Sequence, residues 1–207
     1  MNKILILGEE PFYFVSPLVV NLKKKYANLK VGFLETKLKG RDDAQYEQVF
    51  DENIRVNMKP SLSQMFKAPF YSIFYRSLFR KYGIKESIRA SYVSTQIKTV
   101  FEEYDIINLH LVNKHSLYFL QFIPANKRVV FSFWGTDLLN PPEVSRKLIE
   151  KYIQRANRVT LHTPEMREIF LSKYGRDLID RVKVTLLVDD TQKLEEVIEQ
   201  LPDKNNI

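Results

Sequence analysis

Short apolar segments alternate with longer helical patterns along almost the whole chain, and this alternation limits the folds open to it. The first apolar segment, Ile4 to Gly8, is continuous, as expected for a strand buried on both faces of a sheet. Strands are predicted over 4–8, 29–34, 54–58, 105–110, 128–133, 158–162 and 182–188, and helices over 16–26, 66–82, 86–104, 114–122, 141–156 and 164–174. Such alternation predicts an α/β fold, a three-layer Rossmann-like arrangement with a parallel sheet and helices on both faces.

Three of these helices are predicted to begin at a polar residue followed by proline. The pairs are Ser16-Pro17, Asn140-Pro141 and Thr163-Pro164, each with a capping oxygen before a proline at the first helical position. In a parallel sheet these helix starts lie at the carboxyl edge of the strands, where free N–H groups attract anions. The alternative is helix capping that involves no ligand.

The composition narrows the classes of partner. The chain of 207 residues has a formal net charge of +7, no cysteine and three histidines. The charge favours anionic partners, and since no nucleic-acid-binding motif is present we expect a phosphorylated ligand or an acidic membrane surface. Without thiolates or a histidine cluster we expect no metal site. No apolar run spans a bilayer and no secretory signal follows Met1, so we expect a cytoplasmic protein, peripheral on the inner face of the membrane if it binds one.

The turn after the strand at 128–133 is a candidate binding site. It reads Phe-Trp-Gly-Thr-Asp over residues 133–137 and contains the only tryptophan of the chain. Ligands of open α/β sheets bind beyond the carboxyl ends of strands, so Trp134, Gly135 and Thr136 are candidates for substrate binding and Asp137 for catalysis. The alternative is structural: Trp134 closes the top of the sheet, Gly135 permits the turn, and Asp137 caps it.

The three histidines fall near strand ends. His110 and His162 each end a predicted strand, and His115 lies near the start of the following helix. His110 is the first candidate for a catalytic group, and His115 and His162 are candidates for substrate binding. The alternative for each is a structural hydrogen-bonding side chain.

The segment 59–89 combines aromatic and basic residues. On a helical wheel Phe70 and Tyr71 lie on the aromatic side, with Arg76 and Arg80 opposite and Lys81 in the cationic flank. Such a helix packs its apolar side on the sheet, or lies in a membrane interface with its cations near lipid phosphates. We take these five residues as candidate membrane contacts. The segment can also line an acceptor groove.

Several motifs in order resemble one family. They are Lys3-Ile-Leu-Ile-Leu-Gly8, Tyr104-Asp-Ile-Ile-Asn-Leu-His110, Phe133-Trp-Gly-Thr-Asp137, and Ala156-Asn-Arg-Val-Thr-Leu-His-Thr163 followed by Met166-Arg167. Together they resemble the amino-terminal half of a two-domain glycosyltransferase of the GT-B fold, similar to glycosyltransferase family 4.

This resemblance implies a function. Residues 1–188 correspond to the acceptor-side domain, and 189–207 to a linker helix leading to a donor-binding domain that this sequence lacks. The whole enzyme moves a hexose from a nucleotide-sugar substrate, without a separate cofactor or metal, to a lipid-linked or polysaccharide acceptor of the cell envelope. The fragment alone is then expected to be inactive. The competing hypothesis is a non-catalytic Rossmann-like module that binds an anionic ligand or a membrane surface.

Two departures from the family pattern bear on mechanism. The loop after the first strand carries Glu9 and Glu10 where many relatives have Gly-Gly beside the donor diphosphate. Glu9 is therefore a candidate general base and Glu10 a candidate substrate contact, the alternative being two solvated side chains. Trp134 stands where many retaining members have histidine, and an indole cannot exchange a catalytic proton.

Overall fold

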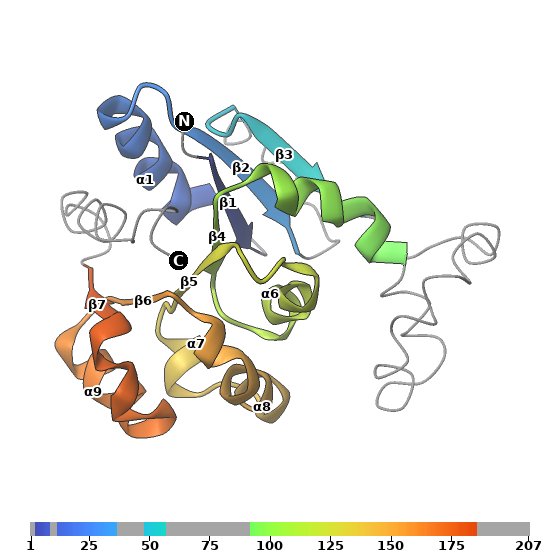
Figure 1. Cartoon of the computed structure of the whole chain (residues 1–207). Helices are drawn as coiled ribbons and strands as arrows, with labels where there is room; N and C mark the ends of the chain where they lie inside the picture. Colours follow the sequence, from blue (N-terminus) through green and yellow to red (C-terminus); the bar gives the residue numbers. More distant parts are fainter. Residues whose placement is uncertain (1–2, 9–11, 37–47, 57–91, 186–207) are drawn as a thin grey trace.

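The computed structural model describes residues 3–8, 12–36, 48–56 and 92–185. They form one parallel sheet of seven strands in the order β3-β2-β1-β4-β5-β6-β7 (Figure 1). This confirms the predicted α/β class and the parallel sheet. The strands are β1 (Lys3–Gly8), β2 (Lys30–Glu35), β3 (Glu52–Arg55), β4 (Ile106–His110), β5 (Arg128–Ser132), β6 (Arg158–Leu161) and β7 (Val182–Val184).

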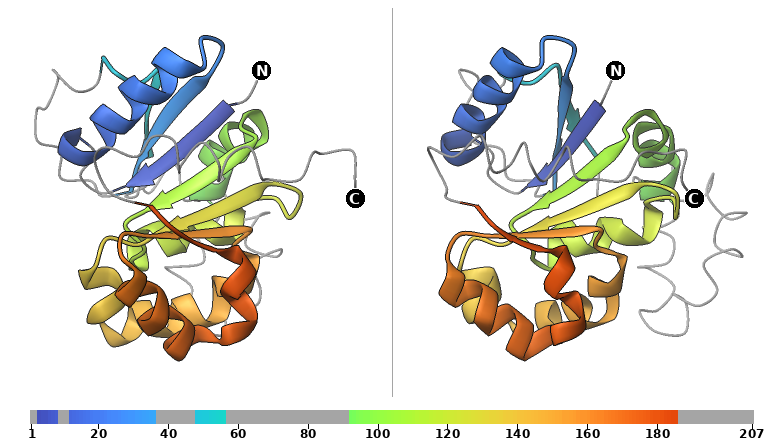
Figure 2. Two further views of the ribbon diagram at one scale, coloured as in Figure 1. Left: turned by 90° about the vertical axis from the view of Figure 1, so that its left-hand side faces the viewer. Right: turned by 60° about the vertical axis from the view of Figure 1, so that its left-hand side comes forward.

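Helices cover both faces of this sheet, as the strand–helix alternation predicts. Helix α1 (Phe12–Lys25) lies on one face, and a helix over 92–103 lies on the other with the remaining helices (Figure 2). These are α6 (Lys114–Phe119), α7 (Thr136–Leu139), α8 (Glu143–Tyr152) and α9 (Pro164–Tyr174), with the 3-10 turns η1 (Leu120–Phe122), η2 (Ile153–Arg155) and η3 (Arg176–Arg181). The described chain is therefore a three-layer α/β sandwich.

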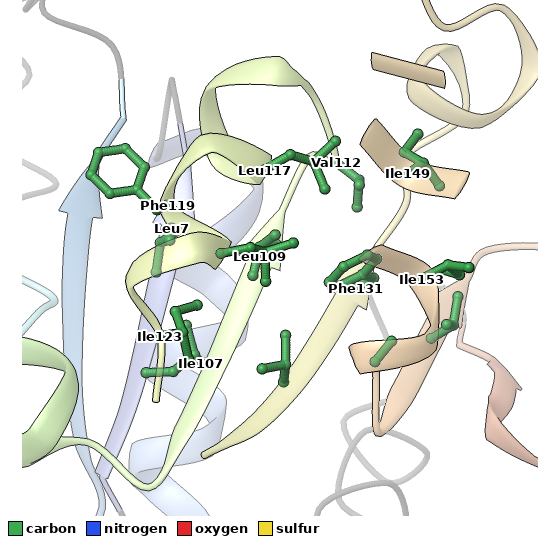
Figure 3. Packing of buried hydrophobic residues seen from close by; sticks show 14 of the residues in the cluster. Leu7, Ile107, Leu109, Val112, Leu117, Phe119, Ile123, Phe131, Ile149 and Ile153 are labelled. Carbon is green, nitrogen blue, oxygen red and sulfur yellow. The ribbon is translucent and has the colours of Figure 1, made fainter. Parts of the chain in front are cut away.

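The core divides into two clusters because successive strand residues point to opposite faces. Beneath α1, Val15 and Val19 pack with Ile6 and Phe33 of the sheet. On the opposite face Leu109 and Phe131 pack with residues of α6, α8 and η2 and with the residue after η1, namely Leu117, Phe119, Ile149, Ile153 and Ile123 (Figure 3). Strands buried on both sides explain why their sequences are continuously apolar.

The predicted helix starts are correct at only one of three positions. Thr163 is the N-cap of α9, where its Oγ1 accepts a hydrogen bond from the Met166 N–H at 3.2 Å. Helix α1 instead begins at Phe12, so Pro17 lies inside it and removes one intrahelical hydrogen bond. Asn140 ends the short helix α7, and α8 begins after Pro142 without a side-chain cap. The short helix α7, which was not predicted, therefore ends at Asn140, the residue that was predicted to begin the next helix.

Several basic side chains bind backbone carbonyls instead of carboxylates. The Arg155 guanidinium donates to the carbonyl oxygens of Leu120, Ile123 and Pro124 at 3.1–3.2 Å. Lys173 Nζ donates to the carbonyl oxygens of Leu138 and Leu139 at 2.8 and 3.0 Å, at the end of α7. Because cations stabilise the exposed carbonyls at helix ends, part of the positive charge is structural.

None of the helices within residues 12–36 and 92–185 is both long and apolar enough to cross a bilayer.

Candidate functional site at the carboxyl ends of β4, β5 and β6

Three aromatic rings meet where three neighbouring strands end. The Trp134 indole, just after β5, lies between the imidazoles of His110, at the end of β4, and His162, just after β6. The ring centroids of His110 and Trp134 are 4.5 Å apart and those of Trp134 and His162 are 5.2 Å apart, with interplanar angles of 75° and 65°. The sheet order β4-β5-β6 therefore brings together three residues that the sequence proposed separately.

His110 is the most enclosed of the three. Its side chain is 9% exposed, and within the described part of the chain neither ring nitrogen has a hydrogen-bond partner. Burial, aided by the nearby His162, lowers the pKa of His110 to about 3. The imidazole is therefore neutral at physiological pH, with one N–H donor and one bare nitrogen acceptor.

Asp137 holds the turn that carries Trp134. Its Oδ1 accepts hydrogen bonds from the N–H groups of Trp134 and Gly135 at 2.8 and 2.9 Å, and its Oδ2 accepts one from Val112 N–H at 2.9 Å. Burial raises the pKa of Asp137, while these backbone N–H groups act to lower it. The Asp137 carboxylate therefore links the turn after β5 to the loop after β4. This agrees with the structural alternative, in which Asp137 caps the turn.

Two residues with positive φ shape these loops. Leu111, directly after β4, has φ 69°, an uncommon conformation for a residue with a side chain. It turns the chain so that Val112 N–H points at Asp137, and Ser116 Oγ donates to the Leu111 carbonyl at 2.9 Å. Gly135 has φ 130°, which other residues rarely adopt, so glycine is needed in the turn for its backbone.

A buried polar chain lies below the rings on the same side of the strands. Thr160 Oγ1 donates to Ser132 Oγ, and Ser132 Oγ donates to Asn108 Oδ1, both at 2.8 Å. These residues link β6, β5 and β4, and sequence reasoning missed them. The sequence does contain a signal for them. Asn108 and His110 are polar residues two positions apart in β4, on the face where β1 has apolar residues.

The other predicted site residues are distributed as follows. Thr136 is exposed at the first position of α7. His115 lies in the first turn of α6, where its backbone N–H donates to Asn113 Oδ1 at 2.8 Å. Glu9 and Glu10, and the candidate membrane contacts Phe70, Tyr71, Arg76, Arg80 and Lys81, lie outside the described residues.

A separate hollow of about 510 Å³ lies where α7, α8 and the end of α9 meet. Asn140, Arg146, Glu150, Lys173 and Tyr174 are among its lining residues. Burial raises the pKa of Tyr174 to about 12. No predicted site residue lines this hollow, so the ring array remains the candidate site. Among the described residues, no group of three or more histidine, cysteine or acidic side chains could hold a metal ion.

Comparison with known proteins adds evidence about the fold. No protein-family model matches the sequence, and a search of curated proteins finds no match. Among solved structures, the UDP-GlcNAc 2-epimerase of Methanocaldococcus jannaschii aligns with 97% of this chain and 50% of its own, at 14% identity and a TM-score of 0.54. HepE of Anabaena in complex with UDP-glucose aligns with 90% of this chain and 44% of its own, at 14% identity and a TM-score of 0.56.

The fold is GT-B-like. A putative UDP-N-acetylglucosamine 2-epimerase of Listeria monocytogenes gives the same result, covering 88% of this chain at 16% identity and a TM-score of 0.50. The chain spans about half the length of these structures, between 44% and 50%. At such low identities the likeness establishes the GT-B-like, Rossmann-like architecture.

Proposed function

We propose that this chain is the acceptor-side domain of a glycosyltransferase that moves a hexose from a nucleotide-sugar to a lipid-linked or polysaccharide acceptor. The observation that carries the proposal is the array of His110, Trp134 and His162 at the carboxyl edge of a GT-B-like sheet. Ligands of open α/β sheets bind at this edge. Two of the solved structures with this fold are HepE with UDP-glucose and HepE with UDP and glucose.

The array suits a sugar better than a phosphate. Burial keeps His110 neutral, so it offers a hydrogen-bond donor and an acceptor and no positive charge. Sugar hydroxyls both donate and accept, whereas an ionised phosphate only accepts. In the proposed enzyme His110 contacts the reacting sugar, Trp134 presents an aromatic surface, and Asp137 holds the turn. Glu9 is proposed as the general base and Glu10 as a substrate contact.

Transfer by the full-length protein tests this function. We expect Trp134→Ala to lower kcat/KM for sugar transfer about tenfold or more, because an aromatic contact contributes about 0.5–1.5 kcal/mol beyond the burial of its area. Trp134→Phe retains an aromatic ring and is expected to lose less. Lys147→Ala, at an exposed position of α8, is the control and should match the unaltered enzyme. Release of UDP from UDP-glucose in the presence of acceptor measures the rate; equal rates for all three variants would remove Trp134 from the site.

A second enzymatic function is nucleotide-sugar epimerisation, favoured by the fold likeness to two 2-epimerases. One incubation separates the two functions. With UDP-GlcNAc and no acceptor, an epimerase inverts the sugar at C2 and keeps the diphosphate bond, which NMR detects directly. Transfer instead requires an acceptor and releases UDP. If the full-length protein gives neither product, the remaining hypothesis is a non-catalytic module for an anionic ligand or a membrane surface.

The proposed location is the cytoplasm, with peripheral binding to an anionic membrane through the segment 59–89. We expect the chain to co-sediment at low salt with vesicles containing phosphatidylserine, since each basic residue near such a surface contributes about 1 kcal/mol. Replacing Arg76, Arg80 and Lys81 together by glutamine should weaken this binding at least tenfold. The matched control replaces Arg146, Lys147 and Lys151 of α8 in the same way. Equal loss in both triple variants would indicate a general charge effect and contradict a role for this segment.

A further inference from the structure

The backbone carbonyl of Thr185 holds His162 in one tautomer. Its Nδ1 lies 3.2 Å from the carbonyl oxygen of Thr185. A carbonyl oxygen only accepts hydrogen bonds, so Nδ1 carries the hydrogen. Thr185 is itself fixed, because its N–H donates to the Leu161 carbonyl at 2.7 Å and its side chain is buried.

The neutral form of His162 predominates at physiological pH. Burial lowers the pKa of His162, although the Thr185 carbonyl and the charge of Asp137 act to raise it. A neutral imidazole has a hydrogen on only one nitrogen. Since Nδ1 carries it, Nε2 is a bare acceptor.

This acceptor lacks a partner among the described residues. Nε2 is shielded from solvent and accepts no hydrogen bond there, while His162 as a whole residue is partly exposed and its ring lies beside Trp134. An acceptor that has lost its water without gaining another donor costs about 1–3 kcal/mol. A ligand that brings an O–H group recovers this cost, and an ionised phosphate, which has no hydrogen to donate, does not.

We propose that His162 is the hydrogen-bond acceptor for a hydroxyl of the ligand, in the Nδ1–H tautomer fixed by the Thr185 carbonyl. The ligand class is an uncharged polyol, such as a sugar ring, seated beside Trp134. The inference rests on the proposed function, which it deepens by assigning the sugar-hydroxyl contact to a particular nitrogen. Thr185 acts through its backbone and is a positioning residue.

The tautomer can be measured without any ligand. In protein labelled with ¹⁵N at histidine, long-range ¹H–¹⁵N spectra at neutral pH should show His162 with a protonated Nδ1 and an unprotonated Nε2. The His162→Gln spectrum assigns the signals by loss. Finding the hydrogen on Nε2 would overturn the proposal whatever reaction the full-length protein performs.

Two amide substitutions separate ligand binding from anchoring. His162→Asn places an amide N–H where Nδ1 lies and can keep the bond to Thr185, but it provides nothing at the Nε2 position. His162→Gln reaches the Nε2 position with its amide oxygen but does not replace Nδ1. We expect His162→Asn to fold with near-normal stability and to weaken binding of glucose, used as the probe in NMR titrations of the full 207-residue chain, about tenfold. His162→Gln should bind glucose within about threefold of the unaltered chain while melting at a lower temperature.

The outcomes are distinguishable. Unchanged glucose binding by His162→Asn, or no glucose binding by the unaltered chain, would overturn the proposal. Glucose binding that depends on Nε2, in a protein whose full-length form transfers no sugar, would support the assignment of His162 and contradict the proposed glycosyltransferase function instead.

Discussion

Replacing Asp137 by alanine is expected to lower the free energy of unfolding by about 3 kcal/mol, because it leaves three backbone N–H groups without their acceptor and each such loss costs about 1–3 kcal/mol where water cannot replace it. The loss separates the turn after β5 from the loop after β4. Because Trp134 is the only tryptophan and lies in the turn after β5, its fluorescence reports this separation. We expect emission at longer wavelength before global unfolding, and a lower midpoint in urea.

Asp137→Asn refines this test. An amide has one oxygen, which can serve Trp134 and Gly135, but its NH₂ group then faces the Val112 N–H, donor against donor. The expected loss is therefore smaller than for alanine but clearly measurable. Asp180→Ala, at an exposed position of η3, is the control and should leave the urea midpoint nearly unchanged. If Asp137→Asn is as stable as the unaltered chain, the Val112 contact carries little of the stability.

Gly32→Ala is expected to lower the free energy of unfolding by about 3 kcal/mol, because overpacking a rigid core costs about 1–3 kcal/mol and sometimes more. A Cβ at position 32 would lie closest to the Tyr104 hydroxyl oxygen, 2.6 Å from Tyr104 Cζ and 3.0 Å from Cε1. The Tyr104 side chain is 3% exposed and its hydroxyl donates to Glu52 Oε2 at 2.9 Å, so the ring has little room to move aside. Thermal and urea unfolding both measure the effect.

Second-site variants identify the clash as its cause. Tyr104→Phe removes the hydroxyl oxygen, which lies nearest the added Cβ, but leaves Cζ 2.6 Å from it, so it should rescue Gly32→Ala only slightly. Tyr104→Leu removes the far half of the ring and should restore part of the stability in the double variant, despite its own cost when made alone. If both second-site variants add independently to Gly32→Ala, the glycine is required for another reason.

The fold was largely predictable because strands buried on both faces appear in the sequence as uninterrupted apolar runs. The run from Ile4 to Leu7 is apolar without interruption, and it belongs to β1, an interior strand of the sheet. Helix starts were less predictable, since polar-proline pairs also occur inside a helix, as at Pro17, or after one, as at Asn140. The contact of Gly32 with Tyr104 joins positions distant in the chain, and local patterns do not encode such pairs.

The candidate site was predictable in outline. His110, Trp134 and His162 follow neighbouring strands, and parallel strands bring their carboxyl ends to one edge. The partners of Asp137 were not predictable, because its bond to Val112 depends on the positive φ of Leu111, for which leucine gives no sequence signal. The same holds for the acceptor role proposed for His162, which depends on the carbonyl of Thr185.

The basic side chains that bind carbonyl oxygens have a consequence for acid conditions. A carbonyl does not titrate, so the contacts of Arg155 and Lys173 persist when carboxylates become protonated. Asp51 is different: partial burial acts to raise its pKa, but bonds from Val31 N–H and Lys23 lower it below 3.8. A lowered folded-state pKa stabilises the fold above the unfolded value, and this contribution is lost as the pH falls through the folded value. The contacts of Arg155 and Lys173 are therefore expected to persist as the pH falls, whereas the link from Lys23 and Val31 to Asp51 is lost when Asp51 becomes protonated.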